Sequence, residues 1–464
     1  LLMGRCQTTE REIRKRGARA YVATLLTGAV ACMVCVLPYG GLFRHIDHLK
    51  EECYYRATPP VVYTLPLSIL ADLLESNRPV SEEEIASARQ WLKDRESFRG
   101  DSIPPMAYKP DNVVMIIVES LEAWPLQKSV EGKEITPCLN RLLTDTASIW
   151  FAPRVLSQVG PGRSIDGQLL MTAGLLPMPD YVYSMRFPEQ DYPHLAKELR
   201  ADRGQKSYLL SGDRATTWNQ GAVAKSFGID EVRFRDSWDS SESFGHPRNP
   251  SDGSFLRQVV EKMKSGEIWP EGEKALVEVI TYSSHFPFTI PEEHRRIKLS
   301  DNYPAPLGDY ITAINYTDNA VGEFVSYLRP DADKTMIVIV GDHEGLASWR
   351  GPIRESSSRL ASLVDEESFV PMIVLNSPHP GRHDKVMGQV DIYPTILDLA
   401  GITAPSFPGL GISALSPDAP GAAIDITGHI AGDTTAISPE TLRHLQSSYP
   451  VSSTIIRANL LHHN

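Results

Sequence analysis

The segment from Met336 to Val340 is an uninterrupted apolar run, followed after one glycine by an acid and an imidazole, Asp342 and His343. A run of this kind is typical of a strand that is buried on both faces of a parallel sheet. Two further apolar runs end beside a residue able to bind a metal or a phosphate: Val113 to Val118, before Glu119, and Ala275 to Thr281, before His285. Because the carboxyl ends of parallel strands share one edge of a sheet, we predict a metal-dependent active site there.

Beyond residue 110, apolar runs alternate with segments of helical period. The predicted strands are Val113 to Val118, Ser207 to Leu210, Leu276 to Thr281, Met336 to Val340 and Val370 to Leu375. The predicted helices are Pro137 to Thr146, Ser164 to Thr172, Pro193 to Ala201, Gly253 to Met263, Leu307 to Leu328 and Ile392 to Ala400. Strands that are apolar throughout, separated by helices, predict a doubly wound α/β fold, a mostly parallel sheet with helices on both faces.

The chain has 464 residues and a formal net charge of −12. Because nucleic-acid binders usually carry a basic surface, this charge predicts no nucleic-acid partner. The five cysteines are scattered, and their spacing predicts neither a disulfide framework nor a zinc cluster.

Residues Arg11 to Arg19 hold five Lys or Arg and one Glu, directly before an uncharged stretch from Ala20 to Leu37 that continues through Phe43. Eighteen helical residues cover about 27 Å, close to the thickness of the hydrocarbon core of a bilayer. We therefore predict a cytoplasmic basic segment at 1–19 and a transmembrane helix at 20–43, with the rest of the chain outside the cell. A cleaved signal peptide is the alternative. Because the first residue is not Met, we also expect further sequence upstream, unless the methionine at position 3 is the start.

The exported part is predicted to have three sections: a juxtamembrane connector at 44–110, a catalytic α/β domain at 111–404 and a small C-terminal subdomain or appendage at 405–464. The prolines just before Asp111 mark the first boundary. The last section is rich in Gly, Pro, Ser and Ala, and we expect short strands near Ala423 to Ile426 and Ser453 to Ile456.

Ser164 is the candidate nucleophile, and it lies in a turn rich in Gly and Pro that leads into the apolar stretch Leu169 to Met171. This position predicts a place near a helix N-terminus, where free N–H groups favour an anion. A metal bound to the serine oxygen would generate the nucleophile without a separate base. An ordinary serine N-cap is the alternative.

Asp342 and His343 together suit Mn²⁺, Zn²⁺ or Mg²⁺, and Glu119 adds a third ligand from another strand end. The alternative for each acid is a helix cap. His285 lies among aromatic residues just past a buried strand, where it can hold a phosphoryl oxygen, protonate a leaving group, or simply pack. Trp218 is either a substrate wall or a core residue.

Nine segments occur in the order in which a known group of enzymes has them: NVVMIIVES from residue 112, then ITPCLNRL, GRSIDGQ, TWNQ, SSHFPF, INYTDNAVGEFVSYL, VGDHEG, VPMIVLNSP and QVDIYPTILDLAGI. With these motifs the stretch from Asn112 to Ile402 resembles the sulfatase and alkaline phosphatase superfamily, and most closely the lipoteichoic acid synthase type of phosphoglycerol transferase.

The resemblance implies one divalent metal ion, with Mn²⁺ favoured and Zn²⁺, Mg²⁺ or Ca²⁺ as alternatives. The implied metal ligands are Glu119, Ser164, Asp342 and His343. In the same way, His285 corresponds to a histidine that binds the substrate phosphate, and Trp218 to a tryptophan that lines the head-group pocket. The implied reaction is a double displacement, in which Ser164 takes the phosphoryl-bearing group from a donor lipid and an acceptor hydroxyl or water then frees it.

The sequence departs from the pattern of these enzymes in the head-group pocket. Ser211 stands where a histidine is expected and Gln220 where an arginine is expected, while Asp213 and Arg214 lie nearby. Losing a bidentate arginine contact weakens the match to phosphoglycerol itself. We therefore expect Trp218, Gln220, Ser211 and Arg214 to contact a head group that is either phosphoglycerol or phosphoethanolamine.

Two further departures concern the chemistry. Ser164 replaces the usual threonine, and Glu344 replaces a glycine and adds charge near the metal site. Ser164 is not part of a C/S-x-P-x-R sequence, the pattern that is converted to formylglycine in true sulfatases. The extra Asp and His ligands of a two-zinc phosphatase are not evident in the sequence, although Asp166 and Asp391 are candidates.

These observations predict a transferase anchored in a bacterial-type cell membrane, with its catalytic domain facing outside. It would move a phosphoglycerol or phosphoethanolamine head group from a phospholipid to a glycan or lipid acceptor through a phospho-Ser intermediate. A phosphodiesterase or sulfatase-type ester hydrolase on the same site is the first alternative. A catalytically inactive binding protein is the second, and the intact set of implied metal ligands speaks against it.

Overall fold

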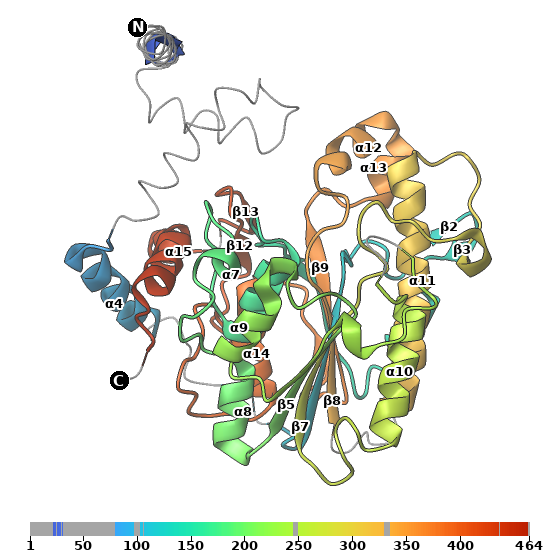
Figure 1. Ribbon diagram of the computed structural model, residues 1–464, viewed down its shortest axis with the longest axis horizontal. Helices are drawn as coiled ribbons and strands as arrows, with labels where there is room; N and C mark the ends of the chain where they lie inside the picture. Colours follow the sequence, from blue (N-terminus) through green and yellow to red (C-terminus); the bar gives the residue numbers. More distant parts are fainter. Residues whose placement is uncertain are drawn as a thin grey trace, which may run out of the picture. The chain divides into compact units, whose positions relative to one another are not determined.

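The computed structural model describes most of the chain beyond residue 78 (Figure 1). The described residues are 79–96, 103–104, 106–244, 249–328, 335–435 and 437–462, together with 22–24, 26–28 and 30. The chain divides into two compact units, Leu1–Pro79 and Val80–Asn464. Residues 22–24, 26–28 and 30 are helical, but the remainder of the predicted span at 20–43, and all of 1–19, lie outside the described residues. Among the described residues, no helix has the length and apolar character to cross a membrane.

The second unit is built on one nine-stranded sheet, in the order β10-β4-β9-β8-β1-β7-β5-β6, with β11 paired to β4. The strands are β1 Asn112–Val118, β4 Trp150–Leu156, β5 Lys206–Ser211, β6 Glu231–Arg233, β7 Ala275–Ile280, β8 Thr335–Gly341, β9 Phe369–Leu375, β10 Gly381–Arg382 and β11 Met387–Gly388. Strand β1 lies at the centre and pairs in parallel with β7 and β8. Each of the five strands predicted from the sequence has a counterpart in this sheet, namely β1, β5, β7, β8 or β9.

The sheet is mixed, because β9 runs antiparallel to both of its neighbours, β8 and β4. Strand β9 is apolar and buried along its whole length, so its composition could not reveal its direction. Strand β4 was not predicted. It contains Pro153, and its register against β9 shifts between Ala152 and Val155, which interrupts the pattern that marks a regular strand.

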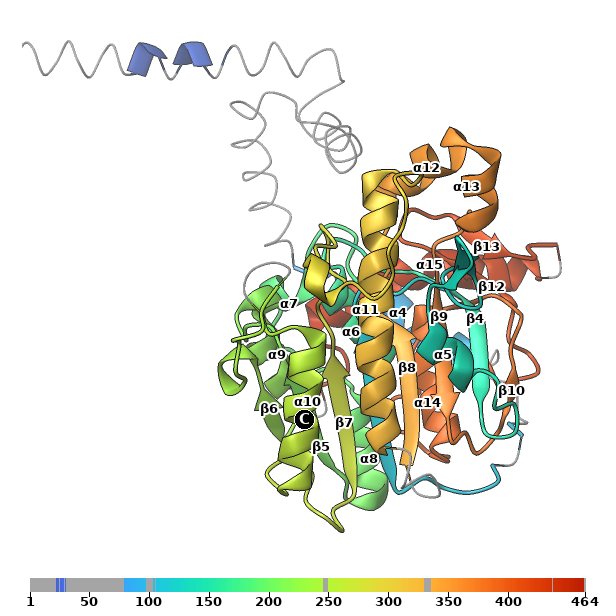
Figure 2. The ribbon, with the colours of Figure 1, turned by 90° about the vertical axis from the view of Figure 1, so that its right-hand side faces the viewer.

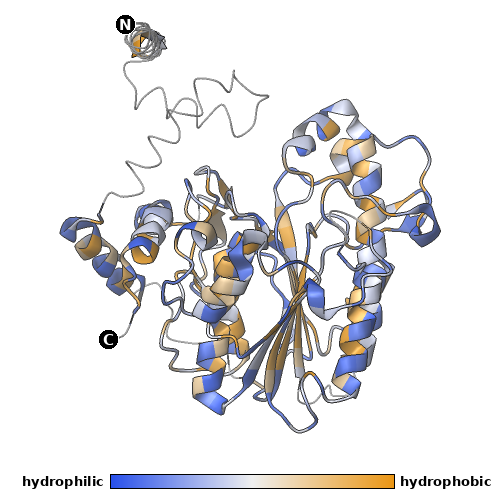
Figure 3. Cartoon of the chain, in the orientation of Figure 1, coloured by the Kyte–Doolittle hydropathy of each residue, from blue (hydrophilic) through white to orange (hydrophobic). Residues whose placement is uncertain are grey.

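Helices cover both faces of the sheet, as Figures 1 and 2 show. Alternate residues of β1 point into two separate cores: Met115 belongs to one and Ile116 to the other. The first core is closed by α8 Leu195–Arg203 and α14 Ile392–Leu399. The second is closed by α10 Asp252–Lys264 and α11 Ala305–Leu328. In Figure 3 the central strands carry much of the apolar colour, and the outer faces of the helices are largely polar. Burial on both faces explains why the strands are apolar throughout.

The remaining helices are short or lie at the periphery of this unit. They are α4 Glu82–Glu96, α5 Pro137–Leu142, α6 Ser164–Gln168, α7 Tyr183–Arg186, α9 Gln220–Ser226, α12 Arg350–Ser356, α13 Ser358–Leu363 and α15 Pro439–Ala458. A π-helix, Leu169–Ala173, continues α6.

The C-terminal section contains one strand near a predicted position and one helix where a strand was expected. Strand β12, Ala422–Ile424, pairs with β13, Ile430–Gly432. The strand predicted at Ser453 to Ile456 is wrong, because these residues belong to α15. In this helix Tyr449, Ser452 and Ile456 are buried at helical spacing, and the helix packs along α4. The short apolar run at its end is therefore one face of an amphipathic helix.

Candidate active site

Strand register brings the predicted metal ligands together. Val118, the last residue of β1, pairs with Gly341, the last residue of β8. The next residue of each strand, Glu119 or Asp342, therefore emerges at the same edge of the sheet. The backbone N–H of Asp342 donates to the carbonyl oxygen of Val118 at 3.2 Å, which ties the two strand ends together.

Glu119, Asp342 and His343 form a buried cluster whose ligand atoms all lie within 4.8 Å of one another. His343 Nε2 is 3.3 Å from Glu119 Oε1 and 3.6 Å from Asp342 Oδ2. Oδ1 of Asp342 accepts a hydrogen bond from the backbone N–H of Ser120 at 2.7 Å. Its Oδ2 is buried and has no hydrogen-bond partner among the described residues. A buried carboxylate oxygen without a hydrogen-bond partner, a second carboxylate and an imidazole together form a set of ligands that suits a divalent cation.

The ring of His343 is oriented to present Nε2 to this cluster. Its Nδ1 lies 2.9 Å from the backbone carbonyl oxygen of Glu344. A proton on Nδ1 can be donated to that carbonyl, and the lone pair of Nε2 is then free for a metal.

The ionisation of the cluster reflects its burial. Burial, and then the charge of Glu119, raise the pKa of Asp342 to about 7. Burial alone would lower the pKa of His343, but the carboxylates of Asp342 and Glu119 raise it to about 9. Burial also opposes ionisation of Glu119, yet the charge of His343 outweighs it and holds the pKa of Glu119 well below its usual range. Without a cation, the cluster therefore retains protons to balance its negative charge.

Ser164 is the first residue of α6 and reaches the same cluster. Its Oγ lies 3.1 Å from Glu119 Oε2 and 3.2 Å from His343 Nε2. The preceding residue, Arg163, has a positive φ of 49° with ψ of −111°, a strained conformation for a residue with a side chain. This sharp turn, rather than an ordinary N-cap, delivers the hydroxyl to the cluster, since Ser164 itself is inside the helix.

Two neighbours hold the Ser164 turn in place. Asp166 Oδ2 accepts hydrogen bonds from the backbone N–H groups of Gly160, at 3.0 Å, and Gly162, at 2.8 Å. A Cβ at Gly167 would lie 2.5 Å from the carbonyl oxygen of Asp342, so only glycine permits this approach to β8. Asp166 therefore closes the loop and is not a member of the cluster of Glu119, Asp342 and His343.

Asp391 also has a structural role. Its carboxylate accepts hydrogen bonds from the backbone N–H groups of Gly388 and Ile412 at 2.8 and 2.7 Å. Among the described residues it does not join the cluster of Glu119, Asp342 and His343.

The charge of Glu344 is compensated locally. Its carboxylate forms an ion pair with Arg163 and accepts a hydrogen bond from Ser157 Oγ at 2.6 Å. Burial opposes ionisation, but the charge of Arg163 lowers the pKa of Glu344 to about 2. Arg163 Nη2 also donates a hydrogen bond to the backbone carbonyl oxygen of Glu344 at 2.7 Å, the oxygen that faces His343 Nδ1. The Arg163–Glu344 pair therefore supports the metal cluster from outside and adds no uncompensated charge to it.

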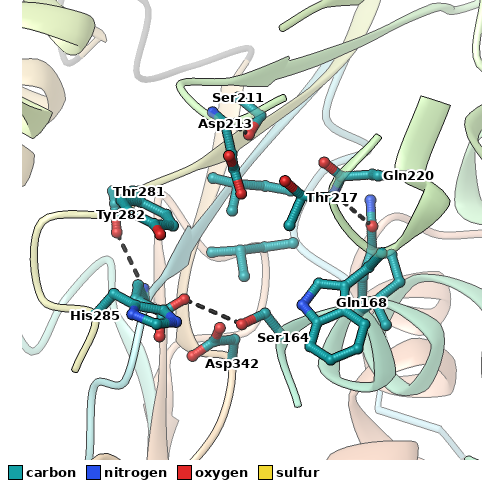
Figure 4. Close-up of a pocket in the computed structure, with 15 residues that line it drawn as sticks. Ser164, Gln168, Ser211, Asp213, Thr217, Gln220, Thr281, Tyr282, His285 and Asp342 are labelled. Atoms are coloured by element: carbon teal, nitrogen blue, oxygen red, sulfur yellow. Dashed lines mark hydrogen bonds between the residues drawn. The ribbon is translucent and has the colours of Figure 1, made fainter. Parts of the chain in front are cut away.

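A pocket opens above Ser164 (Figure 4). Its lining residues come from the ends of several strands, from α6 and from the segment after β5: Ile117, Glu119, Ser164, Ile165, Gln168, Ser211, Asp213, Thr217, Trp218, Gln220, Ile280, Thr281, Tyr282, His285 and Asp342. Figure 4 shows Ser164, Asp342 and His285 at one end of the cavity and Ser211 and Asp213 at the other. We call these the reaction end and the head-group end.

The predicted substrate-binding residues separate into two groups. Trp218, Gln220 and Ser211 line the pocket, whereas Arg214 is exposed and does not. His285 lines the reaction end, and its ring stacks on that of Tyr282 at 5.1 Å between centroids.

Sequence reasoning missed several lining residues, among them the polar Gln168, Thr217 and Tyr282. Gln168 and Thr217 stand inside the GRSIDGQ and TWNQ motifs, and Tyr282 directly follows a predicted strand. Their place in these segments was an available signal, but nothing in their residue types distinguished them from ordinary polar positions.

The sequence pattern of the sulfatase family matches residues 111–402. The chain belongs to this family. It is 28% identical over 339 residues to the lipoteichoic acid synthase of Staphylococcus aureus, an alignment that covers 70% of this chain and 51% of that protein. The chain thus spans about half the length of the curated relatives it matches.

Two solved structures share the fold. The lipoteichoic acid synthase LtaP from Listeria monocytogenes superposes with a TM-score of 0.66 and 19% identity, covering 79% of this chain and 98% of that one. The Streptococcus pyogenes phosphoglycerol transferase GacH, in complex with sn-glycerol-1-phosphate, gives a TM-score of 0.51 and 15% identity, covering 80% and 92%.

Proposed function

We propose that this protein is a metal-dependent phosphotransferase. It moves a phosphoglycerol or phosphoethanolamine head group from a phospholipid to a glycan or lipid acceptor through a phospho-Ser164 intermediate. The observation that carries the proposal is the contact of Ser164 Oγ with Glu119 and His343 at the reaction end of the pocket. A hydroxyl held against a buried carboxylate and an imidazole is the arrangement of an activated nucleophile.

The reaction end fits one divalent cation, for which we propose Glu119, Ser164, Asp342 and His343 as ligands. The partnerless Asp342 Oδ2 supports this assignment, and Mn²⁺ is the favoured ion, with Zn²⁺, Mg²⁺ or Ca²⁺ as alternatives. When bound, the ion supplies positive charge that favours the serine alkoxide and balances the phosphoryl oxygens.

His285 is the proposed acid and base. Its Nδ1 lies 2.6 Å from the carbonyl oxygen of Phe286, which leaves Nε2 for the substrate. In the first step Ser164, which has given up its hydroxyl proton to solvent and reacts as the alkoxide, bonds to phosphorus; the bond to the diacylglycerol oxygen breaks, and protonated His285 gives its proton to that oxygen. In the second step an acceptor hydroxyl gives its proton to His285 and bonds to phosphorus, and the bond to Ser164 breaks, which restores the Ser164 alkoxide and protonated His285.

We propose that the helix at 20–43 anchors the enzyme in a bacterial-type cell membrane, with the catalytic domain at 111–404 and the section at 405–464 outside. A lipid donor favours such tethering, because it keeps the pocket near the bilayer. The rival is an ester hydrolase in which water replaces the acceptor in the second step. It uses the same residues, so only reaction products distinguish the two.

The test is intact-mass spectrometry of the full chain in detergent with Mn²⁺ and either phosphatidylglycerol or phosphatidylethanolamine. We expect a head-group adduct that is absent in Ser164→Ala, whose rate of turnover should fall by about 10³-fold or more because the covalent route is lost. Ser164→Ala should retain its fold, measured by circular dichroism. Turnover of a generic phosphodiester or sulfate ester with no adduct from either lipid would favour the hydrolase.

A further inference from the structure

The head-group end of the pocket carries a carboxylate without a counter-charge. Asp213 Oδ1 accepts a hydrogen bond from the backbone N–H of Arg214 at 2.7 Å, and no described residue forms an ion pair with it. None of the residues that line this pocket is Lys or Arg. In Figure 4 the Asp213 side chain points into the cavity from the side opposite Ser164. The charge of Asp213 therefore faces whatever occupies this end.

A chain of amide hydrogen bonds sets the polarity of the neighbouring wall. Gln168 Nε2 donates to Oε2 of the fully buried Glu278 at 3.3 Å. The other end of that amide, Gln168 Oε1, then accepts from Gln220 Nε2 at 3.0 Å. Because its N–H₂ group is directed at Gln168, Gln220 turns its carbonyl oxygen toward other partners, and no described residue donates to that oxygen. Gln220 thus offers the pocket an acceptor.

Trp218 adds an aromatic surface to the wall of the pocket. It lines the cavity and is 37% exposed, so its ring is accessible to a ligand. Aromatic faces attract cations, and tryptophan does so most strongly. The carboxylate of Asp213 and the amide carbonyl of Gln220 together suit a small group that is positively charged and donates several hydrogen bonds, and an indole in the pocket wall is compatible with such a group.

We infer that the head-group end binds a primary ammonium, so that the donor lipid is phosphatidylethanolamine rather than phosphatidylglycerol. This inference rests on the proposed function. The hydroxyls of glycerol can also donate to Asp213, but only an ammonium brings a full positive charge, which adds Coulombic attraction to the carboxylate. A glycerol group would also leave the charge of Asp213 uncompensated in a partly enclosed site.

The experiment compares rates of Ser164 adduct formation in the full chain with Mn²⁺ and micelles that contain either lipid. We expect phosphatidylethanolamine to react about tenfold faster or more. In Asp213→Asn the ratio of the two rates should fall toward one. The asparagine retains an oxygen for the N–H of Arg214, so the loop is preserved. Asp236→Asn removes the same charge from a side chain that is 91% exposed, and it should keep the preference.

The outcomes separate the two proposals. An adduct that forms as fast or faster from phosphatidylglycerol would overturn the ammonium site and leave the phosphotransferase standing. A preference for phosphatidylethanolamine that survives in Asp213→Asn would also overturn the site, because another group would then carry the selectivity. No adduct from either lipid would remove the phosphotransferase proposal and, with it, this inference.

Discussion

The reaction end and the head-group end of the pocket differ in how they are held. Glu119, Asp342 and His343 directly follow central parallel strands and are buried. The head-group end comes from the segment after β5, where Trp218 and Asn219 have positive φ values of 51° and 55° and are partly exposed. A group that follows a paired strand is positioned by the sheet, whereas a loop can change its side chains without disturbing the core. Under the proposed function, this difference would allow one reaction to be combined with different head groups.

The largest effect should come from removing a ligand at the reaction end. In Asp342→Asn we expect Mn²⁺ affinity, measured by calorimetry, to fall by about 10²-fold or more, and adduct formation with it. Metal-free Asp342→Asn should not be less stable than the metal-free parent in thermal unfolding, because it loses one of two adjacent buried carboxylates. In Asp213→Asn the Mn²⁺ affinity should stay the same. An equal loss of Mn²⁺ in both variants would break the distinction between the two ends.

His285→Ala should have the next largest effect. We expect adduct formation to slow by about 10²- to 10⁴-fold, since proton transfer to the leaving oxygen is lost. Its Mn²⁺ affinity should match that of the parent chain. Loss of Mn²⁺ in this variant would instead make His285 a ligand and move it into the metal cluster.

Mn²⁺ binding should depend on pH at the reaction end. The metal needs an ionised Asp342 and a free His343 Nε2, and the pKa values of these groups without metal are about 7 and about 9. Binding therefore releases protons, so affinity should fall as pH drops below about 9 and fall more steeply below about 7, by up to tenfold per pH unit for each proton. Calorimetry in two buffers of different ionisation enthalpy counts the protons. An affinity that is constant from pH 6 to 9 would contradict this assignment.

The smallest effect should come from the amide chain at the head-group end. Gln168→Met keeps the length of the side chain and frees the Gln220 amide to turn its N–H₂ group toward the pocket. We expect the preference for phosphatidylethanolamine to fall by about fivefold, the value of one neutral hydrogen bond. Mn²⁺ affinity serves as the internal control and should not change. An unaltered preference would show that Gln220 does not take part in selecting the head group.

Much of the fold was predictable because buried strands and amphipathic helices leave periodic patterns over a few consecutive residues. Strand β8 and the polar residues that follow it are an example. The direction of β9 was not predictable, since a fully buried strand has the same composition whether its neighbours are parallel or antiparallel. The run in α15 was too short to separate a strand from one face of a helix, and its packing on α4 decided the matter.

For the site, the sequence by itself determined which acids, imidazoles and hydroxyls end up at strand termini, because local periodicity sets where each strand stops. Only the tertiary structure decided their partners. It joined Glu344 to Arg163, left Arg214 outside the pocket and connected Gln168 on α6 to Glu278 on β7. These pairs are far apart in the chain, and their contacts depend on strand register and helix packing rather than on the residues beside them.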